Sequence, residues 1–201
     1  MIMPKKIGPR WRVQFRRKRT AKTDYRQRLR LLRSGRQRLV IRLSLKHISV
    51  QIVRAAPSGD ETLVSAHSKE LGKLGWKGHT SNLPAAYLVG LLCGYRARKE
   101  GIEGVILDIG MQAPAAGGRI FAALKGVLDA GLNVPHGEGV LPKDERIRGD
   151  HIAQYAEKLK SEDEDTYKKV FSSYLQRGFP PEQLPQHFEQ IKQAIITQHG
   201  A

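Results

Sequence analysis

The positive charge of this chain is concentrated at one end, which restricts where a hydrophobic core can form. Residues 1–38 contain fifteen Lys and Arg and a single acid, Asp24, so they carry +14 of the net +16 of the 201-residue chain. Such a segment repels itself in isolation, and we expect it to order fully only against a polyanion. The core must therefore come from residues 39–201, whose charges nearly balance.

The basic segment divides into an arm and a short helix. Residues 1 to about 22 show no hydrophobic period and contain two prolines and a glycine, which predicts an extended arm. Thr23 or Asp24 is suited to cap a helix that Gly35 ends. One face of this helix, suited to docking on a core, carries Tyr25, Leu29 and Leu32. The neighbouring face carries Arg26, Arg30 and Arg33.

From Leu39 the hydrophobic period changes from that of a helix to that of a strand. Apolar residues alternate along residues 39–43 and again along residues 48–53, with four residues between them. Residues 62–68 follow the turn-forming sequence APSGDE and suit a third strand. The pattern predicts a three-strand antiparallel meander.

The next segments predict a crossover. Residues 83–99 are apolar on nearly all sides, as expected for a buried helix that begins after a Ser81 or Asn82 cap. Residues 104–110, GVILDIG, suit a strand covered on both faces, and residues 117–130 suit a second helix. A strand, a helix and a strand in this order imply parallel pairing. The predicted fold class is α/β (α+β), with helices packed on a sheet of mixed parallel and antiparallel strands.

The last part of the chain has another composition. Residues 151–201 hold six bases and seven acids, and three amphipathic stretches predict short helices separated by the acidic run SEDED and by two prolines. We therefore divide the chain into a basic arm and helix at 1–38, an α/β core at 39–135, and a linker with a helical extension at 136–201.

Residue types that carry catalysis or bind metals are scattered. The spacings CxxC, HxxxH and HExxH do not occur, and the glycines near residue 117 fit neither GxGxxG nor GxxxxGK[ST]. We expect no catalytic residue, no metal site, no cofactor and no small-molecule substrate. The single Cys93 lies in the most apolar segment, so we expect a buried thiol in a reducing cytosol.

An acidic cluster is the alternative to this interpretation. Asp108, together with Glu70, Glu103 or Asp129, has the chemistry of a metal-dependent RNA-processing enzyme. Nothing in the spacing places these acids together. Asp108 is more simply a strand-terminal acid that caps a loop.

The basic segment itself points to nucleic acid. Its apolar face is too narrow for a membrane-surface helix, and the longest apolar run, residues 84–95, is too short to span a bilayer. Trp11 and Phe15 alternate with arginines, as in segments that pair guanidinium with phosphate and stack rings on bases. Packing of the two rings on the chain's own core is the alternative. An irregular arm without a DNA-reading motif favours folded RNA.

Three blocks resemble one protein family. They are RRKRTAKTDYRQRLRLLRSGRQRLVIRLSLKHISVQIV, LVSAHSKELGKLGWKGHTSNLPAAYLVGLLCG and GVILDIG. They resemble the archaeal form of the large-subunit ribosomal protein numbered eighteen in the universal scheme, the counterpart of eukaryotic large-subunit protein five. The resemblance covers roughly residues 8–145, and the helical tail is similar to the extension of archaeal and eukaryotic members.

The resemblance implies a structural, non-catalytic role in the cytoplasmic ribosome. The family binds 5S rRNA and helps to attach it to the large-subunit, 23S-type rRNA in the central protuberance, beside large-subunit protein five of the universal scheme. Carried over by position, RNA contacts are expected at Arg10, Trp11, Arg12, Phe15, Arg16, Arg17, Lys18, Arg19, Lys22, Tyr25, Arg26, Arg28, Arg30, Arg33, Arg36, Arg42, Lys46, His47, Lys69 and Lys77.

Overall fold

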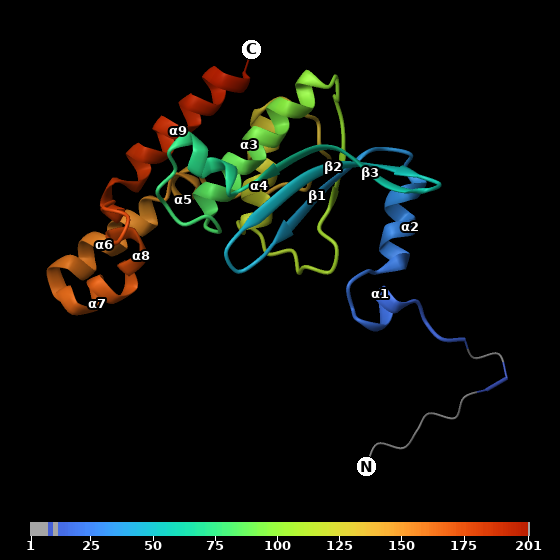
Figure 1. The fold of residues 1–201 in the computed structure, drawn as a ribbon, viewed down its shortest axis with the longest axis horizontal. Coiled ribbons are helices and arrows are strands. Elements are labelled where there is room, and N and C mark those ends of the chain that lie inside the picture. The colour runs from blue at the N-terminus through green and yellow to red at the C-terminus, as the bar shows by residue number, and fades with distance from the viewer. Residues whose placement is uncertain (1–7, 10–11, 201) are drawn as a thin grey trace.

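The computed structural model describes residues 8–9 and 12–200, and within them a four-stranded mixed sheet lies at the centre (Figure 1). Its strands are β1 (Arg38–Leu43), β2 (Ile48–Ala56), β3 (Gly59–His67) and β4 (Ile106–Asp108). The first three form the predicted antiparallel meander, and β4 pairs in parallel with β1, which gives the order β3-β2-β1-β4. The predicted α/β fold with a mixed sheet is therefore confirmed.

The β2–β3 hairpin is tighter than the sequence predicted. Ala56 pairs with Gly59, so the turn holds only Pro57 and Ser58, and the third strand begins three residues before the expected Thr62. Gly59 has φ of +144°, a conformation that other residues rarely adopt. Asp60 disfavours strands in general, but here two arginines bind its carboxylate, as described below.

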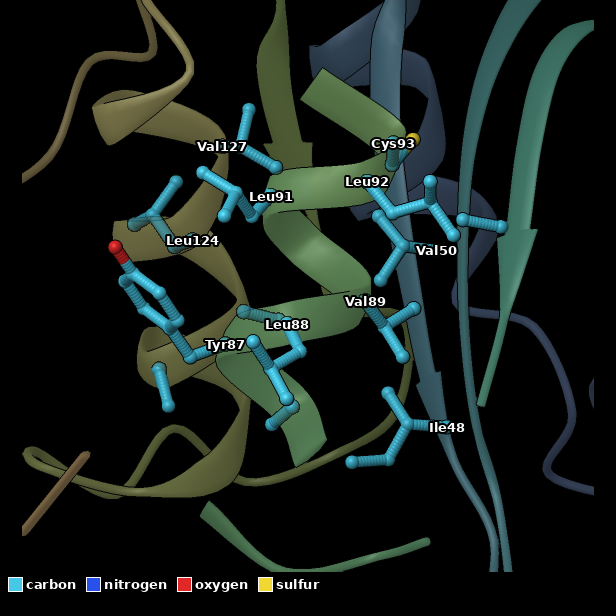
Figure 2. Close-up of a cluster of buried hydrophobic side chains, with 14 of the residues drawn as sticks. Ile48, Val50, Tyr87, Leu88, Val89, Leu91, Leu92, Cys93, Leu124 and Val127 are labelled. Atoms are coloured by element: carbon cyan, nitrogen blue, oxygen red, sulfur yellow. The ribbon is translucent and has the colours of Figure 1, made fainter. Parts of the chain in front are cut away.

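Helices cover one face of the sheet. Helix α3 (Leu83–Lys99) lies between the sheet and α4 (Arg119–Asp129), with Val89 and Leu92 toward the strands and Leu91 toward α4 (Figure 2). The Asn82 side chain caps α3 by accepting a hydrogen bond from Ala85 N at 2.9 Å, as predicted. Cys93 is fully buried in α3, and this burial raises the pKa of its thiol to about 12. The expectation of a buried thiol is confirmed.

The prediction of a strand covered on both faces is wrong for β4. This strand lies at the edge of the sheet, and both Ile106 and Leu107 are only half-buried. The helices α3 and α4 cover a single face, and the other face is left to polar contacts with the N-terminal part of the chain. A continuous apolar run does not distinguish an edge strand from a central one.

Helices α3 and α4 approach each other through glycines. A Cβ on Gly126 of α4 would overlap the carbonyl oxygen of Tyr87, and one on Gly90 of α3 would overlap that of Ala123. A Cβ on Gly94 would lie 2.5 Å from Ala130 Cβ. The two helix backbones are therefore in direct contact, as small residues permit.

The C-terminal part contains more helices than the three predicted. They are α5 (Asp144–Arg148), α6 (Asp150–Glu162), α7 (Glu164–Val170), α8 (Ser172–Leu175) and α9 (Leu184–His199), with a 3₁₀ turn at Pro181–Gln183. Another 3₁₀ turn, at Glu70–Leu74, lies between β3 and α3. The segment expected to be a linker contains α5. Within the acidic run SEDED, helical structure is interrupted only at Asp163, whose side chain caps α7 by accepting a hydrogen bond from Thr166 N at 3.0 Å. Helix α9 packs on α3 and buries Phe188 and Ile195 in the main core.

The N-terminal part differs from the expected extended arm in one place. A single helical turn, α1 (Arg16–Arg19), forms where Phe15 O accepts from two backbone N–H groups and Thr20 Oγ1 donates to Arg16 O. Helix α2 (Tyr25–Arg33) follows and begins at Asp24, which accepts from the backbone of Arg26 at 2.8 Å. The Asp24 cap is confirmed. Figure 1 shows α2 beside the β2–β3 hairpin, with α1 farther from the sheet.

Candidate nucleic-acid interface

An ion pair attaches helix α2 to the sheet. None of its residues is fully buried, and Leu29, expected to dock, is 52% exposed. Instead Arg28 donates two hydrogen bonds to Asp60 of β3, from Nη1 to Oδ2 at 2.8 Å and from Nη2 to Oδ1 at 2.7 Å. Such bidentate pairs fix orientation as well as distance. Of the predicted docking face, Leu29 is therefore wrong, whereas Tyr25 and Leu32 are half-buried.

The ion pair of α2 continues into the sheet as a network of alternating charge. Arg38 of β1, which is 3% exposed, donates from Nη1 to Asp108 Oδ2 at 2.8 Å, and its Nη2 lies 2.7 Å from Asp60 Oδ2 outside hydrogen-bond geometry. Arg42 donates from Nη2 to Asp108 Oδ1 at 3.0 Å and from Nη1 to the Asp108 carbonyl at 2.7 Å. The network joins α2, β3, β1 and β4.

Sequence reasoning missed Arg38 and Asp60. The strand alternation held a signal for Arg38, because Leu39 and Ile41 face the helices and the residues that alternate with them, Arg38 included, must face the opposite side. No local pattern could find Asp60, whose partners lie far away in sequence. The expected loop-capping role of Asp108 is confirmed, because its Oδ1 accepts from Gly110 N at 2.9 Å.

The network makes the attachment of α2 sensitive to acid. The hydrogen bonds from Arg28 are the main cause that lowers the pKa of Asp60 from 3.8 to about 2, against a smaller opposing effect of burial. The folded-state pKa is depressed, so this contribution to stability is complete above pH 3.8 and is lost as the pH falls through about 2. Asp60→Asn should therefore lower the free energy of unfolding by about 1 to 2 kcal/mol above about pH 4.

Urea unfolding of both proteins between about pH 2 and pH 5 measures this difference. We expect the difference to shrink toward zero at the acid end, where Asp60 is protonated in the wild type. A difference that stays constant with pH would contradict the assignment. Glu61→Gln is the matched control, since Glu61 forms a mostly exposed pair with Arg54 that should contribute little.

The predicted RNA-contact residues are accessible wherever the structure describes them. Arg10 and Trp11 lie outside the described residues. Half-buried members are Tyr25, Arg28, Arg42 and His47. Exposed members are Arg12, Phe15, Arg16, Arg17, Lys18, Arg19, Lys22, Arg26, Arg30, Arg33, Arg36, Lys46, Lys69 and Lys77. Within residues 8–9 and 12–200, no exposed cation of this set has an acid within 4.0 Å, whereas Arg28 and Arg42 do.

The exposed cations of α1, of α2 and of the segment between them form what we call the N-terminal cationic surface. It comprises Arg16, Arg17, Lys18, Arg19, Lys22, Arg26, Arg30 and Arg33. Phe15 stands beside it, 70% exposed, with its ring centroid 5.2 Å from that of Tyr25. Phe15 thus contacts α2 and not the core, and most of its ring stays open. Its stacking on bases remains a prediction.

The other predicted residues lie elsewhere. Lys46 and His47 are in the β1–β2 turn, at the opposite end of β2 from α2. The His47 ring packs 5.1 Å from that of His67, and burial, followed by nearby positive charge, lowers its pKa. Lys77 N donates to His187 Nε2 of α9. The structure therefore does not unite all predicted contacts in one site.

A cleft lies between α2 and the face of the sheet that no helix of the core covers. Its volume is about 490 Å³, and charged groups from α1, α2, β1 and β4 line it. The cations at its walls are Arg17, Lys22, Arg28, Arg38 and Arg42. The cleft connects the N-terminal cationic surface with the ion network.

The acids of the enzymatic alternative are not brought together. Asp108 binds arginines, Glu70 Oε2 accepts from Arg96 at 2.7 Å, and Asp129 accepts from the Tyr87 hydroxyl at 2.7 Å. In the part of the chain that the structure describes, no three His, Cys, Asp or Glu residues are placed to hold a metal ion. Among the same residues, every helix is too short or too polar to cross a membrane.

Comparison with known proteins gives two findings. Residues 9–102 and 96–137 match the family described as "Ribosomal large subunit proteins 60S L5, and 50S L18". The chain is also 56% identical, over 188 residues, to "Large ribosomal subunit protein uL18" of Methanothermobacter thermautotrophicus. That similarity spans 94% of this chain and 96% of the relative, so it includes most of the C-terminal helices.

Proposed function

Because the chain belongs to the family of ribosomal large-subunit proteins 60S L5 and 50S L18, we propose that it binds 5S rRNA and helps to attach this RNA to the large-subunit rRNA in the central protuberance. As a family member it is a structural component of the large ribosomal subunit and not an enzyme. Large-subunit protein five of the universal scheme is the proposed protein neighbour.

The N-terminal cationic surface is the observation that supports RNA binding most directly. Its eight Lys and Arg are exposed and have no acid within 4.0 Å among the described residues, whereas the sheet arginines Arg38, Arg42 and Arg54 each form an ion pair. Uncompensated charge of one sign on a short segment is unfavourable unless a polyanion neutralises it. Residues 1–38 are therefore the proposed main RNA-binding part, with Lys46, His47, Lys69 and Lys77 as contacts to a second RNA segment.

Selective binding of 5S rRNA tests the proposal. We expect the full chain to bind 5S rRNA transcribed in vitro more tightly than tRNA of similar length, in filter-binding titrations at several salt concentrations. If about eight side chains contact phosphate, log K should fall against log salt with a slope of roughly −6 to −7.

Two results would contradict the proposal in different ways. Equal affinity for both RNAs would reduce the basic segment to a general polycation. An affinity that does not change with salt would remove phosphate contacts as its source.

A further inference from the structure

We propose that the cleft between α2 and the sheet receives one unpaired nucleotide of the bound RNA, with its base inside the cleft. This inference rests on the proposed RNA binding and assigns a site within it. The volume of about 490 Å³ falls in the range of roughly 300–1,000 Å³ that is common for small-molecule sites. A phosphate group alone would leave most of this space unfilled.

The lining differs in character between the side formed by the N-terminal segment and the side formed by the sheet. Arg17 and Lys22 are exposed and unpaired with acids among the described residues, so they suit the phosphate. Closer to the sheet, Val40 and Val53 are buried and apolar, and Gln51 adds an amide that can pair with a base edge. Together, the phosphate-binding, apolar and amide groups match the phosphate, the base ring and the polar base edge of a nucleotide.

Arg42 is placed to stack on the base. Three of its N–H groups are engaged, with the Ile41 carbonyl at 2.9 Å and with two oxygens of Asp108, so the guanidinium plane is fixed. A Cβ on Gly110 would lie 3.0 Å from Cζ, 3.0 Å from Nη2 and 3.3 Å from Nε, so Gly110 covers one face of that plane. The side chain is still 41% exposed and lines the cleft.

On the sheet side of the cleft, the surrounding charge favours a base over a phosphate. Asp108 is shared by Arg42 and Arg38, and Asp60 is shared by Arg28 and Arg38, so two carboxylates offset two of the three guanidinium charges. A second anion would compete with two carboxylates for the same guanidinium groups. A neutral base avoids that competition and can use the open face of Arg42 by stacking.

Arg42→Lys in the full chain separates stacking from simple charge. Lysine keeps the positive charge but has no planar group, so affinity for 5S rRNA transcribed in vitro should fall about tenfold, the effect of losing one stacked base, with the salt slope unchanged. Affinity equal to that of the wild type would overturn the proposal. Arg54→Lys is the matched control, because Arg54 lies on β2 outside the cleft and should change nothing.

A second variant guards against a loosened ion network in Arg42→Lys. Gln51→Phe fills the cleft, takes part in no ion pair, and should release one base that the wild type protects from dimethyl sulfate or carbodiimide. Hydroxyl-radical protection of the backbone should persist. If the variant protects the same bases as the wild type, the cleft assignment is overturned while RNA binding stands. If the wild type itself binds 5S rRNA and tRNA equally well, the proposed function is overturned.

Discussion

A chain that begins at Gly35 should bind 5S rRNA about a thousandfold more weakly than the full chain at about 0.15 M salt. The deletion removes thirteen Lys and Arg and the whole N-terminal cationic surface. Each phosphate contact contributes through the release of counterions, so the slope of log K against log salt should also become several units shallower. Mobility-shift titrations of both chains at three or more salt concentrations give affinity and slope together.

The control must separate local charge from total charge. Replacing Arg26, Arg30 and Arg33 of α2 with Gln in the full chain should weaken binding about a hundredfold and reduce the slope by about two to three. The same change at Lys158, Lys168 and Lys169 of the C-terminal helices removes equal charge, and all three are exposed. If both triple variants lose the same affinity, binding depends on net charge and the proposed surface is wrong.

Gly126→Ala should lower the free energy of unfolding by about 3 kcal/mol or more. The added Cβ would overlap the Tyr87 carbonyl and also lie 2.7 Å from Leu91 N, and both are backbone atoms of a buried helix. A flexible side chain can move aside, but here the whole of α4 must shift away from α3. Urea unfolding followed by circular dichroism measures the loss.

Gly72→Ala is the comparison for this substitution. Gly72 lies in a 3₁₀ turn, and a Cβ there meets nothing within 4 Å. Because alanine restricts the unfolded chain more than glycine does, this variant should be unchanged or more stable by about 0.4–1 kcal/mol. If Gly126→Ala were equally stable, the claim that the packing of α3 against α4 requires a residue without a Cβ at position 126 would be wrong.

Much of the core could be predicted because its signals are local. Alternation along residues 39–53 located two strands, and the Asn82 cap with an apolar run located α3. The Asp24 cap located the start of α2 for the same reason. In each case the residues that determine the element lie within the element or next to it.

The site could be predicted only in part because its decisive contacts are distant in sequence. The spacing of Leu29 suggested a docked apolar face, but Arg28 and Asp60, 32 residues apart, hold α2 instead. Arg38 and Asp108 are 70 residues apart. Composition revealed that the first 38 residues are basic, but not which arginines are free and which are held by acids.

In strand β1, residues that pack in the core alternate with residues that take part in the ion network. Leu39 and Ile41 are fully buried and fill space in the core, so substitutions there should reduce the amount of folded protein in a cell. Arg42 alternates with them, and its side chain is 41% exposed and lines the cleft, so changes there should disturb the fold less and mainly affect incorporation into the large subunit. Neighbouring codons of one short strand are therefore subject to separate kinds of selection, one on abundance and one on assembly.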